Sequence, residues 1–163
     1  MRNGPRGAVL VSGASSQIGL FLLPRLLRAG YEVLALSRSV SGSPSLAEGV
    51  CWMHPERAPA CLQEGNGGGI PTGPVRSIVS CGPPQLAHQL AEQARDLEAM
   101  VVFTTSSTLS KENSADPHER ALMTEIIGQE RQLETSCRQR GVRLAILRPT
   151  LVYGCGLDRN VSL

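Results

Sequence analysis

Residues 11–20, VSGASSQIGL, combine small residues at a spacing that could bind a phosphate group. An apolar run that predicts a strand precedes Gly13, and a helical pattern begins a few residues later. A pyrophosphate binds where backbone amides at a helix amino terminus point outward and no side chain intervenes. Gly13 permits the sharp turn, and Gly19 permits close packing of the helix on the strand. The stretch predicts a phosphate-binding bend, and a simple tight turn is the alternative.

One feature of the usual dinucleotide motif is missing from this bend. Ser16 or Gln17 stands where the motif has its middle glycine. Ser15 and Ser16 add hydroxyl groups that could donate to the same anion. The residues predicted to contact a dinucleotide here are Gly13, Ser15, Ser16, Gln17, Ile18 and Gly19.

The second predicted strand, over residues 32–37, ends without an acidic residue, and this bears on the choice of cofactor. A carboxylate at that place binds the ribose hydroxyls of NAD, whereas a basic residue accommodates the additional phosphate of NADP. Ser37 and Arg38 stand there, and the fork of an arginine side chain suits a phosphate. An ordinary surface arginine is the alternative. Together with the bend, these residues favour NADP over NAD.

Strand and helix patterns alternate along the chain, and they must position these residues. Residues 54–74, rich in glycine and proline, predict an exposed loop. Strands are expected at about 7–12, 32–37, 50–53, 75–82, 100–107 and 142–148, and helices at about 17–29, 83–100 and 117–140. The alternation predicts a single α/β domain over residues 1–163, with a doubly wound, mostly parallel Rossmann-type sheet that helices cover on both faces.

Composition excludes several classes of function. A net charge of +2 and an aromatic content of 3% argue against a nucleic-acid partner. No apolar run approaches 18 residues, so no membrane span is expected, and five cysteines at irregular spacing favour reduced thiols and a cytoplasmic location. Cys51, His54 and Cys61 lie close in sequence, but a fourth ligand at a recognisable spacing is missing, so no metal is expected.

The predicted long helix carries a roughly apolar stripe beside a charged face. Core packing is the simplest interpretation, and a homodimer that packs through the same helix is the alternative. The stripe consists of Leu122, Ile126, Ile127, Leu133 and Cys137.

Three segments together resemble the short-chain dehydrogenase/reductase superfamily, in particular its extended and atypical branches, the NAD-dependent epimerase/dehydratases. VSGASSQIGLFLLPRLLRAGYEVLALSR at 11–38 looks like the cofactor motif of that family. MVVFTTSSTLS at 100–110 resembles the strand that carries its active-site hydroxyl group. GVRLAILRPTLVYGCGLDRN at 141–160 closely resembles its LRPxxVYGPGxxxN segment, which is the most specific of the three. They stand in the family's order along the chain.

The resemblance implies roles for further residues. It places the reacting hydroxyl at Ser106 or the adjacent Ser107, and it places Tyr153 in the segment that supports the cofactor and substrate pocket. It also implies that the backbone after the fourth strand runs past the cofactor. The additional cofactor-binding residues that it implies are Ser80, Cys81, Gly82, Thr105 and Pro149.

The resemblance fails at two points that bear on catalysis. Leu122 and Ile126 stand where the family has its catalytic tyrosine and lysine, and neither can transfer a proton. Tyr153 with Lys111, the sole lysine, is a possible substitute pair. The chain is also expected to end before the substrate domain of the family. Three hypotheses follow. The first is an oxidoreductase-like protein that acts on a nucleotide sugar or related carbonyl or hydroxyl substrate, and the second is a non-catalytic NADP(H)-binding sensor or assembly module. The third is a purely structural fragment that binds no cofactor.

Overall fold

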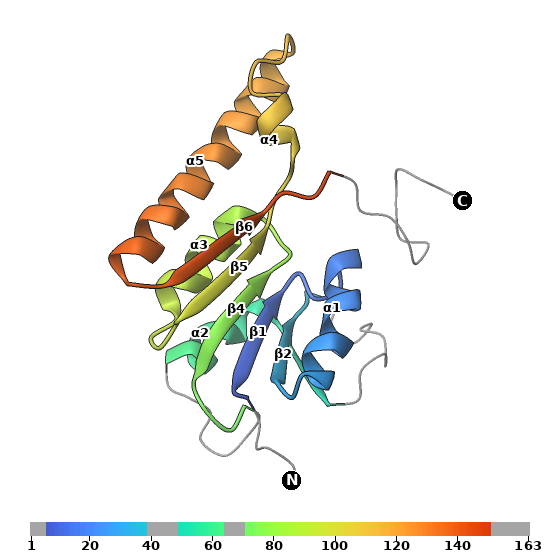
Figure 1. Cartoon of the computed structure of the whole chain (residues 1–163), viewed down its shortest axis with the longest axis vertical. Helices are drawn as coiled ribbons and strands as arrows, with labels where there is room; N and C mark the ends of the chain where they lie inside the picture. Colours follow the sequence, from blue (N-terminus) through green and yellow to red (C-terminus); the bar gives the residue numbers. More distant parts are fainter. Residues whose placement is uncertain (1–5, 39–48, 64–70, 151–163) are drawn as a thin grey trace, which may run out of the picture.

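A single parallel sheet of six strands forms the centre of the computed structural model, which describes residues 6–38, 49–63 and 71–150 (Figure 1). The strand order is β3-β2-β1-β4-β5-β6, and every neighbouring pair is parallel. The strands are β1 (Ala8–Ser12), β2 (Glu32–Leu36), β3 (Val50–Met53), β4 (Val75–Ser80), β5 (Ala99–Phe103) and β6 (Arg143–Leu147). This arrangement confirms the predicted doubly wound α/β fold.

Helices cover both faces of the sheet (Figure 1). Successive residues of β1 point to opposite faces, so Val9 and Val11 pack toward α1 whereas Ala8 and Leu10 pack toward the other helices. α1 covers one face, and α2, α3 and α5 cover the other. The helices are α1 (Gln17–Arg28), η2 (Pro55–Arg57), α2 (Ala58–Gln63), α3 (Pro84–Gln93), α4 (Ser107–Ser110) and α5 (Pro117–Gln139).

The prediction of an exposed loop over residues 54–74 is wrong for its first half. The short helices η2 and α2 occupy residues 55–63. Ala58, Cys61 and Leu62 are buried at helical spacing against the sheet, and this burial stabilises the helix. The prolines in this segment made the helix hard to recognise in the sequence. Pro55 and Pro59 lie in the first turn of their helices, where a missing backbone N–H costs no hydrogen bond.

The apolar stripe predicted along α5 is wrong at its amino-terminal end. Met123, Leu133 and Cys137 are buried, whereas Leu122 is 52% exposed. Figure 1 shows the reason, since the first turns of α5 extend beyond the sheet together with α4. None of the described helices, α5 included, combines the length and hydropathy that crossing a bilayer requires.

The carboxyl-terminal end of α5 is attached to α3 by a charged side chain. The Arg140 guanidinium donates to the carbonyl oxygens of Ala91 and Ala94, which are acceptors at the end of α3. The Ser136 hydroxyl adds a hydrogen bond to Glu92 of the same helix. These contacts hold α5 against the sheet at the point where the chain turns into β6.

The substitution Arg140→Ala is expected to lower the free energy of unfolding by about 1–2 kcal/mol, because it removes two charge-assisted hydrogen bonds. Urea denaturation measures the change. Arg131→Ala is the matched control, since it removes the same charge from an exposed position on α5 whose side chain bonds no other described residue. An equal loss in both variants would contradict the role of Arg140.

Candidate cofactor site

The strand order reverses at β1, and this places the predicted residues together. From β1 the chain proceeds to β2 and β3 on one side, then crosses to β4, β5 and β6 on the other. In such sheets a crevice opens beyond the carboxyl ends of the strands at the point of reversal, and ligands bind there. Gly13, Ser37 and Cys81 follow the carboxyl ends of β1, β2 and β4. Thr105 and Pro149 follow β5 and β6 at the same edge of the sheet.

The bend after β1 requires glycine at position 13 for two reasons. The φ angle of Gly13 is +63°, in the left-handed region that favours glycine. A Cβ at this position would also lie 2.7 Å from the carbonyl carbon and oxygen of Cys81. The Cys81 amide donates to the Ser12 carbonyl at 2.9 Å, and the buried hydroxyls of Ser12 and Ser80 bond at 2.8 Å. The two turns therefore approach each other through backbone atoms.

The start of α1 presents backbone amides to this bend. The Ser16 hydroxyl caps the helix by accepting from the Gly19 amide at 3.2 Å, and a Cβ on Gly19 would lie 2.5 Å from the Ala14 carbonyl oxygen. The Ser15 and Ile18 amides donate to no group in the described part of the chain. Amides at this end of a helix attract an anion, and no acidic residue lies in the first turn.

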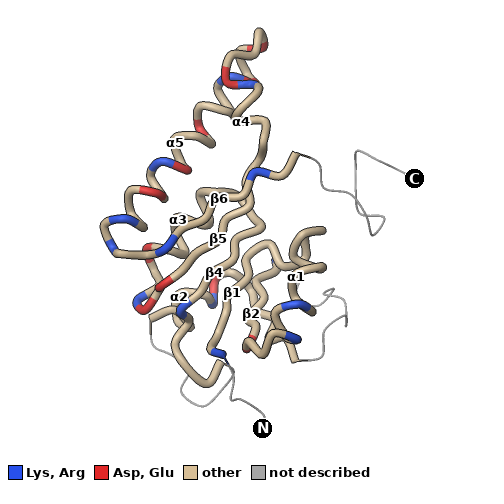
Figure 2. The backbone as a smooth tube through the Cα atoms, viewed as in Figure 1, with Lys and Arg blue, Asp and Glu red and all other residues tan. Residues whose placement is uncertain are grey.

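The end of β2 contributes a hydroxyl and a cation to the same region. Ser37 is 5% exposed, and its hydroxyl lies 3.4 Å from that of Ser15. Arg38 follows and is exposed. The acidic residue of β2, Glu32, lies at the opposite end of the strand, where it accepts hydrogen bonds from Thr72. Figure 2 shows no acidic residue around the bend between β1 and α1 in the described chain.

The turn after β4 offers its backbone, whereas its side chains have other roles. The hydroxyl of Ser80 is buried and bonded to Ser12, so it is directed into the sheet. Burial raises the pKa of the Cys81 thiol to about 11. The thiol is therefore neutral at physiological pH and adds no negative charge beside the bend. Gly82 completes this turn, and a Cβ there would make only ordinary contacts.

Hydroxyl groups cluster after β5. The Thr105 hydroxyl accepts from the Ser107 amide at 3.2 Å, and the Thr108 hydroxyl donates to the Thr105 carbonyl at 2.9 Å. Ser106 and Ser107 are half-buried, and neither hydroxyl bonds another described residue. The Thr104 hydroxyl is buried without a partner among the described residues. The cluster leaves the two predicted reacting hydroxyls available.

The two positions on α5 at which the resemblance places the catalytic tyrosine and lysine carry apolar side chains. Leu122 is exposed and Ile126 is half-buried. Lys111 of the possible substitute pair lies with its Nζ 2.5 Å from Glu119 near the start of α5, so it is paired with a carboxylate in this structure. Hydrogen bonds from Lys111 and Ser114 lower the pKa of the Glu119 carboxyl. Tyr153 lies outside the described residues.

A buried ion pair at the end of β6 was not predicted as part of the site. Arg148 Nη2 lies 2.5 Å from Glu130 Oε2, and the Glu130 side chain is only 4% exposed. The pair fixes the carboxyl end of β6 on α5 and so sets where Pro149 begins the next segment. Within the described chain, Glu130 Oε1 and Arg148 Nε are buried without partners. No cluster of three or more potential metal-ligating side chains occurs among the described residues.

Comparison with known proteins identifies the fold of the chain but finds no related sequence. No protein-family model and no curated protein matches the sequence. Among solved structures, an oxidoreductase of the short-chain dehydrogenase/reductase family from Burkholderia thailandensis superposes with a TM-score of 0.66 at 18% identity, over 95% of this chain and 72% of that one. The chain has the fold of the short-chain dehydrogenase/reductase superfamily.

Two further structures of this fold were solved with ligands bound. UDP-glucose 4-epimerase from Thermotoga maritima, with UDP-glucose, has a TM-score of 0.65 at 12% identity over 86% of this chain and 54% of that one. The methylglyoxal/isovaleraldehyde reductase of yeast, complexed with NADPH, has a TM-score of 0.63 at 16% identity over 90% and 56%. The chain thus spans little more than half the length of these two proteins.

The substitution Gly13→Ala is expected to lower the free energy of unfolding by about 3 kcal/mol, from the positive φ and from the clash of its methyl group with Cys81. Gly141→Ala is the matched control, since its φ is +70° but a Cβ there meets nothing within 4 Å. That variant should lose only about 1 kcal/mol. Similar losses in urea denaturation would show that the two turns do not need this close approach.

Proposed function

We propose that this chain binds NADP(H) at the carboxyl edge of its sheet, with the pyrophosphate on the bend between β1 and α1. The observation that carries the proposal is the pair of amides at the start of α1, those of Ser15 and Ile18, which donate to no group in the described part of the chain. The contact of Gly13 with Cys81 fixes the shape of the bend that presents these amides. The hydroxyls of Ser15 and Ser37 border the same space.

The preference for NADP over NAD rests on charge. Arg38 follows β2 and is exposed, and the only acidic residue of β2 lies at its other end. An arginine at this place accommodates the 2′-phosphate, whereas NAD binding relies on a carboxylate that hydrogen-bonds the ribose. A cytoplasmic location accords with this proposal, because NADP(H) is a soluble cofactor and the cysteine pattern favours reduced thiols.

For chemistry, we propose an oxidoreductase-type reaction on a nucleotide sugar or related carbonyl or hydroxyl substrate. Ser106 and Ser107 would bind the reacting oxygen, and Tyr153 would line the pocket. The support is the available hydroxyl pair after β5 and the likeness in fold to an epimerase bound to UDP-glucose and to a reductase bound to NADPH. NADP(H), when bound, would supply the hydride.

A second candidate is a non-catalytic NADP(H)-binding sensor or assembly module. The apolar side chains of Leu122 and Ile126, and the pairing of Lys111 with Glu119, favour it, because the two positions on α5 that the resemblance assigns to proton transfer carry no titratable group. Both candidates share the cofactor site and differ only in whether turnover follows binding.

The substitution Arg38→Ala is expected to raise the Kd for NADPH about tenfold and to leave the Kd for NADH nearly unchanged, because it removes only the partner of the additional phosphate. Titration of nicotinamide fluorescence measures both constants. Arg95→Ala is the control. It removes an equal charge just before β5, at the end of the sheet where the strands begin and away from the proposed site. An equal rise in the Kd for NADPH and in the Kd for NADH would contradict the preference for NADP.

Turnover separates the two candidates. With NADPH and a panel of keto-sugars, the oxidoreductase is expected to oxidise the cofactor, and the double variant Ser106→Ala/Ser107→Ala should lose about 100-fold in rate with NADPH affinity retained. Ser110→Ala, an exposed hydroxyl on α4, is the control. Saturable NADPH binding without oxidation across the panel would instead select the sensor or assembly module.

A further inference from the structure

Lys111, the sole lysine of the chain, lies at the carboxyl end of α4 and contacts the start of α5. Its Nζ lies 2.5 Å from one carboxylate oxygen of Glu119, and the other oxygen accepts from the Ser114 hydroxyl at 2.5 Å. Glu119 is in the first turn of α5. One carboxylate on α5 therefore binds both the end of α4 and the turn after it. We call the contact of Lys111, Ser114 and Glu119 the clasp.

Further hydrogen bonds stabilise the turn between α4 and α5. The Ser114 hydroxyl, which donates to Glu119, also accepts from the Asp116 amide at 3.2 Å. The Ser114 amide donates to the Lys111 carbonyl at 3.1 Å, and the Arg120 guanidinium donates to the Ser114 carbonyl. Every polar group of Ser114 thus has a partner, so the closed clasp and this conformation of the turn support each other.

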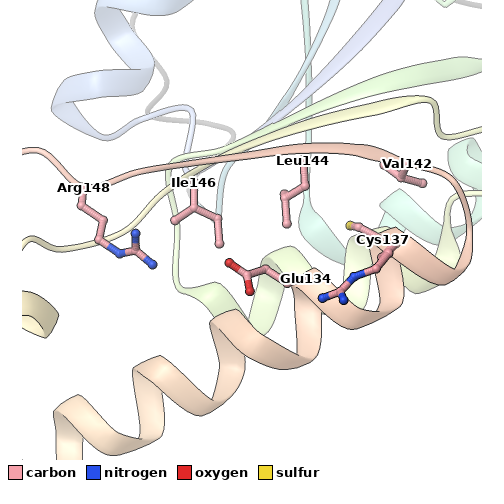
Figure 3. A pocket seen from close by; sticks show the side chains of 7 residues that line it. Glu134, Cys137, Val142, Leu144, Ile146 and Arg148 are labelled. Atoms are coloured by element: carbon pink, nitrogen blue, oxygen red, sulfur yellow. The ribbon is translucent and has the colours of Figure 1, made fainter.

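The helix that carries Glu119 is itself fixed on the sheet. Figure 3 shows Leu144 and Ile146 pointing from β6 toward α5, and Arg148 pairs with Glu130 of that helix. Glu119 lies on the same continuous helix of 23 residues, in the first turns that extend beyond the sheet (Figure 1). A side chain at that place can hold α4 because the rest of α5 is held by the sheet.

α4, in contrast, has little packing of its own. It has four residues, of which only Thr108 is buried, and Leu109 is 74% exposed. A single helical turn is not stable without such support. Its first end is attached to the segment after β5, where the Thr105 hydroxyl accepts from the Ser107 amide. The place of α4 therefore depends on contacts at its two ends, and the clasp supplies those at the second end.

We propose that Glu119 is a positioning residue, which fixes α4 through Lys111 and so orients Ser106 and Ser107 at the carboxyl edge of the sheet. Lys111 then serves as the partner of Glu119 and transfers no proton. That the two serine hydroxyls bind a reacting oxygen rests on the proposed function. The effect of the clasp on α4 is a property of the fold, and it is measurable without a substrate.

The strength of the clasp determines what its loss would change. The Lys111 and Glu119 side chains are 49% and 30% exposed, and ion pairs at such positions contribute little to the stability of a whole domain. Local opening of a segment with few buried contacts requires much less free energy than global unfolding. Loss of the clasp should therefore increase the opening of α4 while the sheet and the buried part of α5 remain folded.

Amide hydrogen exchange of the full chain, followed by NMR, tests the clasp without cofactor or substrate. The Leu109 amide donates to the Ser106 carbonyl at 3.0 Å, so its exchange reports the opening of α4. Glu119→Ala should raise this exchange rate about fivefold, because an exposed ion pair and a hydrogen bond are lost. The exchange rate of the Leu133 amide, in the buried part of α5, should not change. A Leu109 rate equal to that of the unsubstituted chain would overturn the proposal.

A double-mutant cycle tests whether Glu119 acts through Lys111. Lys111→Met should also raise the Leu109 rate, and the double variant Lys111→Met/Glu119→Ala should raise it no further than Glu119→Ala alone, because both substitutions break one contact. Glu112→Ala is the matched control, since it removes an exposed acid beside Lys111 that bonds no other described residue. Effects that multiply in the double variant, or an equal effect of the control, would contradict the clasp.

Turnover with NADPH tests the role assigned to Lys111. Lys111→Arg retains the charge that pairs with Glu119 and should retain the rate, whereas Lys111→Met should lower kcat about tenfold with the Kd for NADPH unchanged. Arginine cannot give up its proton, so a lysine that transfers a proton would lose as much rate with arginine as with methionine. That result would overturn the positioning role. If NADPH binds without oxidation, the oxidoreductase candidate fails, and the exchange rates still decide whether the clasp holds α4.

Discussion

The close approach of two backbone turns at Gly13 is the constraint on which the rest of the candidate cofactor site depends. The bend after β1 and the turn after β4 meet with no space for a Cβ between them, and the bond between the Ser12 and Ser80 hydroxyls holds the two strand ends in register. This contact sets where α1 begins and hence where its amides point. It also explains why glycine is needed at position 13, because a Cβ there would push the turn after β1 away from the turn after β4.

The interior of the sheet was predictable because its strands bury both faces. The run of β1 is apolar or small throughout and is buried at every residue, and this pattern predicts a buried parallel strand without reference to the rest of the chain. The predicted bend and the hydroxyl cluster follow from the same placement, since residues after parallel strands meet at one edge. Local sequence therefore carried most of the fold and the positions of the candidate site.

What the sequence did not reveal depends on contacts between distant residues. The six residues of α2 are too few to show a helical period, and the helix is stabilised by packing of Cys61 and Leu62 against the sheet. Leu122 belongs to the apolar pattern of α5 but lies where the helix has passed the end of the sheet. The pairing of Glu130 with Arg148 joins α5 to β6 across a separation that no local period encodes.

The site also separates two requirements that an oxidoreductase must combine. Cofactor binding at the bend would use backbone amides and the absence of side chains, so it depends on β1, α1 and β4 and not on α5. In the family that the sequence resembles, proton transfer is expected to use two positions on α5, and the resemblance places the apolar Leu122 and Ile126 there. A chain of this fold could therefore lose turnover without losing its cofactor, because substitutions on the outer turns of α5 leave the contact at Gly13 unchanged.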